Sequence, residues 1–316
     1  MGVRFACVAL ATVTGLVACG GSGPVSESPG IQNGTVTLAV TDGPMEGIDA
    51  LVLHVTHIDF GHMDSQITRL EIQDGPLDLD MVQLRNGVTR SLLTRTPVPA
   101  GEYAWLRLGI DPDRSHIELQ TGAHHRLTLA DSEGLRVHEF FQIHNSQHTD
   151  FVLDFDLRLG VQRHHPGGMM GDQWELHPAL RLMHTEDTGA ITGNVDASLI
   201  DVNYPGCDPA LGGNWVYLFP ADALQPDDVA ASDTDGLAGP IATDRVELHF
   251  ETGEYRYHFA FVPQASYRIA FTCAGDWDEP GDNDYPDDPD GRFDFQAFSS
   301  PVDVIAGQVR VFDITP

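Results

Sequence analysis

The chain has 316 residues, which is enough for two domains of ordinary size. Its formal net charge is −30, and its 17 basic residues are all arginine. A field of this sign repels nucleic acid and anionic membrane surfaces, so neither is expected as a binding partner. The 32 glycines, 20 prolines and 41% apolar residues are typical of a turn-rich β protein rather than a helical bundle or a disordered chain.

The N-terminus has the layout of a bacterial lipoprotein signal peptide. One positive charge at Arg4 precedes a short apolar run that ends in the residues Leu16-Val17-Ala18-Cys19. The run is too short to span a bilayer. Its last four residues resemble a lipobox, so we expect cleavage after residues 1–18 and a lipid on Cys19. An ordinary secreted protein with a chance cysteine is the alternative.

Residues 19–33 are predicted to form a flexible tether. The segment "GGSGPVSESPGIQN" is rich in Gly, Ser and Pro, a composition typical of extended linkers. Gly20 follows Cys19 where enteric sorting rules would place an Asp for inner-membrane retention, which favours the outer membrane. Because more than one acyl chain holds a protein durably at a bilayer, we expect a protein anchored to the membrane without spanning it.

Alternating apolar and polar residues recur along the rest of the chain. Examples are "FVLDFDLRL", "WELHPALRL", "EYRYHFAF" and "SYRIAFTC". In the first, Phe and Leu occupy one strand face, while Asp154 and Asp156 occupy the other. No segment has a long helical period, and the stretch from Met81 to Leu84 predicts a single turn. Half-buried strands of this kind pack as antiparallel sheets, so the predicted class is all-β.

Two sequence signals occur twice, in the same order. The strand motif "GTVTLAV" at Gly34 to Val40 is echoed by "GAITGNV" at Gly189 to Val195. The turn motif "VPAGEY" at Val98 to Tyr103 is echoed by "VPQASY" at Val262 to Tyr267. The interval between motifs is 64 residues in the first case and 73 in the second. This echo predicts two tandem β-sandwiches of Greek-key type.

The predicted domains are 34–186 and 189–316, and each resembles a known family. The first resembles domain of unknown function 4382, through "GTVTLAVTDGP", "IDALVLHVTHIDF", "PLDLDMVQLRNG", "PVPAGEYAWLRLGI" and "WELHPALRLM". That resemblance implies an envelope lipoprotein domain without an established activity. The second is similar to carboxypeptidase-regulatory or transthyretin-like sandwiches, through "GAITGNV", "NWVYLFP" and "VPQASYRIAF". Such modules are immunoglobulin-like accessory or binding domains, and neither resemblance implies a catalytic residue.

Two cysteines remain in the body of the protein, Cys207 and Cys273. An even pair in an oxidising compartment predicts a disulfide. The loop that it closes would contribute about 4 kcal/mol through the entropy of the unfolded chain. Metal ligation is the alternative, without the Cys-x-x-Cys spacing that usually accompanies it.

An acidic segment follows Cys273, with eight carboxylates between Asp276 and Asp290. Alternate carboxylates partly mimic a calcium loop, although Pro280 occupies its fifth position and an Asp replaces the usual final Glu. The candidate calcium ligands are Asp276, Asp278, Asp282, Asp284 and Asp287. A solvated acidic loop is the alternative. Trp277 is predicted to be exposed there and is the candidate residue for stacking on a sugar.

Histidine is concentrated in the first domain, with thirteen of the 15 between His54 and His184. The segment "RHHPGGMM" offers His164, His165, Met169 and Met170, and imidazole with thioether ligands suits copper. In a protein without lysine, histidine as polar surface is the alternative.

No catalytic motif is expected to act here, because the chain has neither a Gly-x-Ser-x-Gly elbow nor a glycine-rich phosphate loop. Asp154 and Asp156 could be the paired carboxylates of a glycosidase, but two residues apart on one strand face they are expected to be solvated. We therefore predict a lipid-anchored envelope protein with a non-catalytic binding or scaffold role toward a glycan or protein. An envelope lipoprotein that binds copper or zinc through the histidine-rich first domain is the alternative, and a hydrolase is a third.

Overall fold

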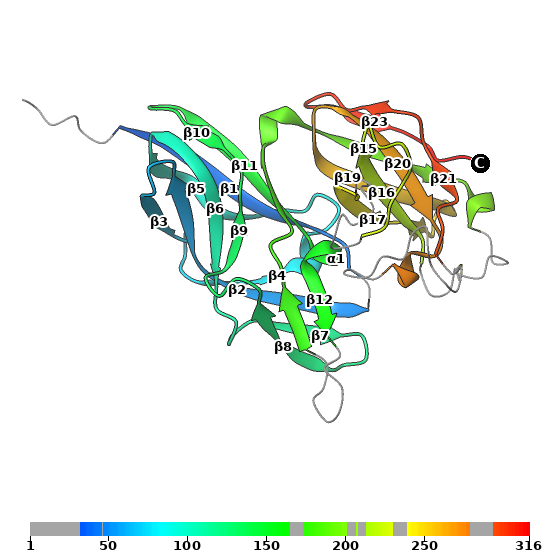
Figure 1. The fold of residues 1–316 in the computed structure, drawn as a ribbon, viewed down its shortest axis with the longest axis horizontal. Coiled ribbons are helices and arrows are strands. Elements are labelled where there is room, and N and C mark those ends of the chain that lie inside the picture. Colours follow the sequence, from blue (N-terminus) through cyan, green and yellow to red (C-terminus); the bar gives the residue numbers. More distant parts are fainter. Residues whose placement is uncertain are drawn as a thin grey trace, which may run out of the picture. The chain divides into compact units, whose positions relative to one another are not determined.

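The computed structural model describes residues 32–45, 47–164, 173–200, 207, 213–229, 239–278 and 293–316. Residues Gln32–Pro316 form one compact unit. Strands dominate the described part of the chain, which confirms the all-β class (Figure 1). Helical structure there is limited to single turns, such as α1 (Leu157–Gly160) and the predicted turn η1 (Met81–Leu84). None of the described helices is long and apolar enough to span a membrane.

Residues 33–184 build two facing sheets. The smaller has the order β14-β11-β1-β5 and comprises β1 (Asn33–Gly43), β5 (Arg90–Pro99), β11 (His148–Asp156) and β14 (Leu180–His184). The larger is centred on the pairing of β2 (Ile48–His62) with β6 (Gly101–Ile110). Its other strands are β3 (Ile67–Glu71), β4 (Leu77–Asp80), β7 (His116–Leu119), β8 (His124–Leu129), β9 (Leu135–Val137), β10 (Phe141–Ile143), β12 (Val161–His164) and β13 (Gln173–Leu176).

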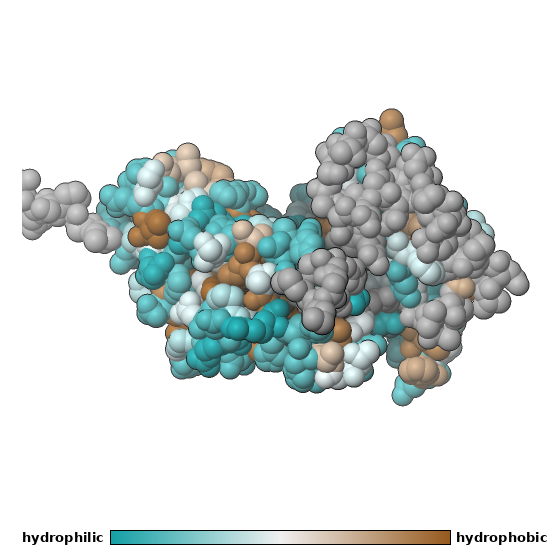
Figure 2. Space-filling view, turned by 60° about the horizontal axis from the view of Figure 1, so that its bottom comes forward, coloured by the Kyte–Doolittle hydropathy of each residue, from teal (hydrophilic) through white to brown (hydrophobic). Residues whose placement is uncertain are grey.

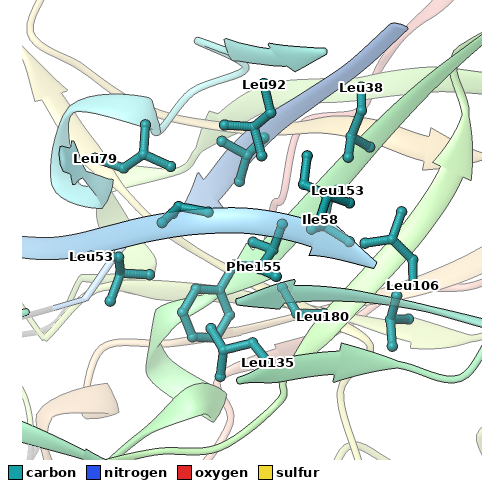
Figure 3. Close-up of a cluster of buried hydrophobic side chains, with 14 of the residues drawn as sticks. Leu38, Leu53, Ile58, Leu79, Leu92, Leu106, Leu135, Leu153, Phe155 and Leu180 are labelled. Carbon is teal, nitrogen blue, oxygen red and sulfur yellow. The ribbon is translucent and has the colours of Figure 1, made fainter. Parts of the chain in front are cut away.

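The core of this first pair of sheets follows from strand alternation. In β1 every second residue from Gly34 to Val40 is buried, as its period of two requires. Figure 3 shows Leu38 and Leu153 of the smaller sheet among the side chains of Ile58 and Leu106 of the larger. Fully burying one such leucine contributes about 2 kcal/mol, so this interface accounts for much of the stability.

Residues 188–311 build a second pair of sheets with its own core. One has the order β18-β19-β15-β23, and the other the order β17-β16-β20-β21 with β22 also on β20. The strands are β15 (Thr188–Val195), β16 (Trp215–Pro220), β17 (Ala242–Arg245), β18 (Glu247–His249), β19 (Glu254–Pro263), β20 (Ser266–Thr272), β21 (Ala297–Phe298), β22 (Val302–Asp303) and β23 (Val309–Val311). Among the described residues, every strand pair joins strands on the same side of Asp187. The exact domain boundaries stay a prediction.

The two sequence echoes occupy the same register in each pair of sheets. Gly34 pairs with Val98 across β1 and β5, and Gly189 pairs with Val262 across β15 and β19. Glycine is required at both places for the same reason. A Cβ on Gly34 would lie 2.5 Å from the backbone carbonyl oxygen of His144, and a Cβ on Gly189 would lie 2.5 Å from that of Ile305.

The sheets are mostly antiparallel, as predicted, but three of the strand pairs in the described part of the chain are parallel. These pairs are β1 with β11, β8 with β13, and β15 with β23. Alternation along a strand does not reveal the direction of its neighbour, so the sequence could not indicate them.

The predicted disulfide is present. Cys207 and Cys273 are bonded, with their Cα atoms 4.9 Å apart, and both side chains are buried in the second core. The described surface on the face shown in Figure 2 is mainly hydrophilic and carries small separate hydrophobic areas, in keeping with the strong negative charge.

Candidate metal centre

A β-ladder in the first pair of sheets gathers two histidines and a glutamate on one face. His164 ends β12, Glu175 lies in the antiparallel neighbour β13, and His177 follows β13. Glu175 pairs with Gln162, so His164 is its diagonal neighbour on the same face. His177 lies two residues beyond Glu175 and therefore points to that face as well. The backbone N–H of His177 donates to the carbonyl oxygen of Gly160 at 2.8 Å, which fixes its position.

The carboxylate of Glu175 lies between the two imidazoles. Its Oε2 atom is 3.0 Å from Nε2 of His177 and 3.4 Å from Nε2 of His164. One ligand atom from each side chain falls within 4.8 Å of the others. The side chains of His164, Glu175 and His177 are 51%, 30% and 32% exposed, so an ion could reach them from solvent.

Two imidazole nitrogens and one carboxylate oxygen are a common protein ligand set for zinc, with a fourth position left for water or another ligand. Imidazole also suits copper. A dication bound there would replace the His–Glu contacts with metal–ligand bonds. The side chains that are present therefore fit a zinc- or copper-type ion without a change in the backbone.

This cluster only partly coincides with the predicted copper site. His164 belongs to both, while His165, Met169 and Met170 lie outside the described residues, so their role stays a prediction. Sequence analysis did not select Glu175 and His177. The available signal was their spacing in "WELHP", because residues two apart in a strand share a face.

The acidic segment is described only at its start. Asp276 is exposed in the turn η4 (Gly275–Trp277), whereas Asp282, Asp284 and Asp287 lie outside the described residues. Asp278 is buried. The calcium prediction for this segment stays a prediction.

Asp278 has partners inside the protein. Its Oδ1 atom accepts a hydrogen bond from the backbone N–H of Val229 at 3.1 Å, and its Oδ2 atom accepts one from the Tyr217 hydroxyl. A guanidinium nitrogen of Arg158 lies 3.4 Å from Oδ2. Burial raises the pKa of Asp278 to about 6, although Arg158 and these hydrogen bonds act in the opposite direction. Asp278 is thus one half of a buried ion pair, and both of its carboxylate oxygens already have partners inside the protein.

Trp277 is 42% exposed, in agreement with the expectation that it lies at the surface. Cys19 precedes the described residues, so its lipidation also stays a prediction.

The expectation that Asp154 and Asp156 are solvated is wrong. They are only 8% and 5% exposed. Arg181 forms an ion pair with Asp154, and Asp156 accepts a hydrogen bond from the backbone N–H of Thr243 at 3.2 Å. Thr243 belongs to the second pair of sheets, which covers the end of β11 at Asp156. The two carboxylates are therefore not an open catalytic pair.

Comparison with known proteins adds little about function. No curated protein is significantly similar in sequence. The TIE protein of Bacillus anthracis aligns with 9% identity over 90% of this chain and 34% of its own, with a TM-score of 0.19. The minor pilin GBS52 of Streptococcus agalactiae aligns with 10% identity over 89% and 98%, with a TM-score of 0.21. A fimbrial protein from Bacteroides ovatus aligns with 9% identity over 90% and 49%, with a TM-score of 0.20.

The chain thus spans about a third of the TIE protein and about half of the fimbrial protein. All three TM-scores lie well below the range of proteins that share an overall fold. The informative match is to a family: residues 33–178, which carry the candidate metal centre, match the family described as Domain of unknown function (DUF4382).

Proposed function

We propose that this chain is a lipid-anchored envelope protein with a non-catalytic role, and that its first sandwich binds a zinc- or copper-type ion. The observation that supports ion binding is the convergence of His164, Glu175 and His177, whose ligand atoms lie within 4.8 Å of one another. The lipobox-like residues that end at Cys19 support the anchor.

The setting of the three side chains favours binding over catalysis. They lie on a strand pair in which His164 pairs with Gln173, so the backbone holds them at nearly fixed separations. They are partly exposed, and a metal there would stay open to exchange with solvent or with a ligand from another protein. A site of this kind suits capture, storage or display of an ion at the envelope.

Calorimetric titration of the purified mature protein with zinc and with copper(II) tests the ion site. We expect one ion per chain and at least about tenfold weaker binding after His177→Ala or Glu175→Gln, because each removes one of three ligands. His144→Ala is the matched control, since His144 is an exposed histidine of the same sandwich outside the cluster. Absence of binding, or binding that survives both ligand substitutions, would contradict the proposal.

The anchor is tested separately. Cys19→Ser should move the protein from the membrane fraction to the soluble fraction, and mass spectrometry of the wild type should find acyl chains on Cys19. An unmodified Cys19 in natively expressed protein would refute the envelope anchor and leave the metal site untouched.

A glycan-binding role is the second candidate, and the exposure of Trp277 supports it. An exposed indole offers a flat apolar face on which a sugar ring stacks. Glycan-array binding that disappears with Trp277→Ala, but persists with His177→Ala, would assign this role to the acidic segment. An array without signal would exclude it.

A further inference from the structure

Four aspartates converge on a small cavity where the two pairs of sheets meet. The cavity has a volume of about 30 Å³. From the first sandwich it is lined by Asp42, at the end of β1, and by Asp154 and Asp156, at the end of β11. Asp244 of β17 lines it from the second sandwich. None of the four is more than 8% exposed. A carboxyl group that has lost its hydration is costly to ionise unless a cation or several donors replace the lost water.

Little positive charge faces the cavity. Among the described residues of its lining, Arg181 is the one arginine, and it already forms an ion pair with Asp154. His258 lines the cavity as well, but burial lowers the pKa of its imidazole, so the ring is neutral at pH 7. The cations in the lining therefore do not balance its four acids.

The surrounding elements carry further charged groups, which add little compensation. They are Arg85 after η1, Arg158 in α1, Arg245 in β17 and Glu247 in β18. Arg85 forms an ion pair with Glu247 at 3.7 Å, and Arg158 lies 3.4 Å from the carboxylate of Asp278. Arg245 lines a neighbouring pocket together with Glu247. Negative charge therefore prevails around the cavity.

Asp42 is the least satisfied of the four acids. It is only 5% exposed, and among the described residues neither of its carboxyl oxygens has a hydrogen-bond partner. Burial, and then repulsion from Asp156 and Asp154, raises the pKa of Asp42 well above its ordinary value. A group in this position lowers its energy by keeping its proton. The cavity has room for one or two water molecules to accept that proton in a hydrogen bond.

Asp244 is in a similar position on the other side of the junction. Its Oδ2 atom accepts a hydrogen bond from the backbone N–H of His258 at 2.7 Å, which favours the ionised form. Burial outweighs this bond and, with repulsion from Glu247, raises the pKa of Asp244 to about 8. Asp156 bridges the two sides, because its Oδ2 atom accepts from the backbone N–H of Thr243 at 3.2 Å.

We propose that this cavity is a proton-operated latch between the two sandwiches, closed while Asp42 and Asp244 are protonated and weakened when they ionise. In the protonated form, each acid adds a donor to a cavity that is otherwise rich in acceptors. In the ionised form, the two acids place negative charges on opposite sides of the junction, beside Asp154 and Asp156, in an interior of low dielectric constant. The latch is separate from the histidine cluster and does not depend on the function proposed above.

Alkali should weaken the latch, because the folded junction holds protons that the unfolded chain has released. An aspartate in an unfolded chain has a pKa of about 3.9, below the raised values in the cavity. The stability that these protons contribute is therefore complete below pH 4. It is lost as the pH rises through the pKa values of the folded state, which is about 8 for Asp244. Each such proton changes the equilibrium constant of unfolding by up to about tenfold per pH unit.

Urea unfolding of the full mature protein at several pH values between 5 and 9 tests the proposal. Asp42→Asn and Asp244→Asn each replace an acid by a neutral group of the same shape. Relative to wild type, the equilibrium constant of unfolding of each variant should fall by at least about tenfold between pH 5 and pH 9. Asp49→Asn, at an exposed aspartate of β2, is the matched control and should follow the wild type at every pH.

Hydrogen exchange distinguishes a latch from a general effect on stability. The backbone N–H of Thr243 in β17 donates across the junction, whereas β6 lies in the core of the first sandwich. After correction for the intrinsic rate, exchange in the wild type should increase between pH 6 and pH 9 more at β17 than at β6. In Asp42→Asn this excess at β17 should be smaller.

Two results would overturn the proposal. One is an equilibrium constant of unfolding that keeps the same ratio to wild type from pH 5 to pH 9 in both Asp42→Asn and Asp244→Asn. The other is an equal increase in exchange at β17 and β6, which would show that the protons stabilise the whole fold and not the junction. If Asp42→Asn fails to fold, Asp244→Asn and the exchange of the wild type decide between these outcomes.

Discussion

The hydroxyl of Tyr103 donates a hydrogen bond to the carbonyl oxygen of Pro99 at 2.6 Å. Tyr267 makes the same contact with the carbonyl oxygen of Pro263 at 2.8 Å. Each tyrosine is buried near the start of a strand and reaches back four residues to the end of the preceding strand. The sequence echo "VPAGEY" and "VPQASY" is therefore a repeated tertiary contact, which in each sandwich closes the turn that connects one sheet to the other.

Tyr103→Phe and Tyr267→Phe should each lower the free energy of unfolding by about 1 kcal/mol. The phenylalanine ring keeps the packing, while a proline carbonyl beside the core loses its donor. Chemical denaturation of each variant measures the loss. Tyr255→Phe, at a partly exposed tyrosine of β19, is the control and should change little. Unaltered stability in both Tyr103→Phe and Tyr267→Phe would show that these hydroxyls do not hold the turns.

The ionised carboxylate of Asp59 should stabilise the fold, and acid should remove this stabilisation. It is fully buried, and burial alone would raise its pKa, but hydrogen bonds from Arg69 at 2.7 Å and Arg107 at 2.6 Å outweigh burial and lower the pKa to about 2. Because this value is below the pKa of about 3.9 in an unfolded chain, the stabilisation is complete above pH 4 and is lost as the pH falls through 2.

Asp59→Asn should therefore lower the free energy of unfolding by about 3 kcal/mol at pH 7, since it leaves the buried Arg107 short of a partner. The difference from wild type should shrink as the pH approaches 2. Urea denaturation at several pH values between 7 and 2 measures both curves. A difference that stays constant over this range would rule out ionised Asp59 as the cause.

Arg158 and Asp278 should behave as a coupled pair. Arg158 is buried over the indole of Trp215, and its guanidinium carbon lies 4.2 Å from the ring centroid. One of its guanidinium nitrogens lies 3.4 Å from Oδ2 of Asp278. Arg158→Met should lower the free energy of unfolding by about 3 kcal/mol, because it deprives the buried Asp278 of its ion-pair partner. Adding Asp278→Asn should recover about 1 kcal/mol or more.

The control for this pair is Arg126→Met, which removes an exposed ion pair with Asp113 and should change stability by less than about 1 kcal/mol. The free energy of unfolding is also measured for Asp278→Asn alone. If the loss in the double variant equals the sum of the losses in the two single variants, Arg158 and Asp278 act independently.

Loss of the disulfide should lower the free energy of unfolding by about 4 kcal/mol, because the bond between Cys207 and Cys273 closes a long loop in the unfolded chain. The variant Cys207→Ser with Cys273→Ser and the reduced wild type should be destabilised alike in urea. Added reductant should have no effect on the double variant. Equal stability of oxidised and reduced wild type would contradict this role.

Strand periodicity predicted the class of the fold because a period of two depends only on neighbouring residues. The motif at Gly34 to Val40 predicted β1, and its echo at Gly189 to Val195 predicted β15 in the same register. The metal cluster was harder to foresee, because His164 and Glu175 meet only through the pairing of β12 with β13. Such a contact depends on the register between the two strands, and the sequence of one strand does not specify how it is aligned with its neighbour.

The sequence by itself determined the strand-rich class, the repeated turn motif and the cysteine pair, since alternation, turn residues and an even cysteine count are local or compositional signals. Only the tertiary structure decided what covers the end of β11 that carries Asp154 and Asp156. Alternation shows that Asp154 and Asp156 lie opposite the apolar residues of their strand, and a polar face ordinarily meets water. Here Thr243 and Asp244 meet it instead, so carboxylates far apart in the chain share one buried cavity. The physical reason is that a strand pattern distinguishes its two faces but does not specify what packs on either of them.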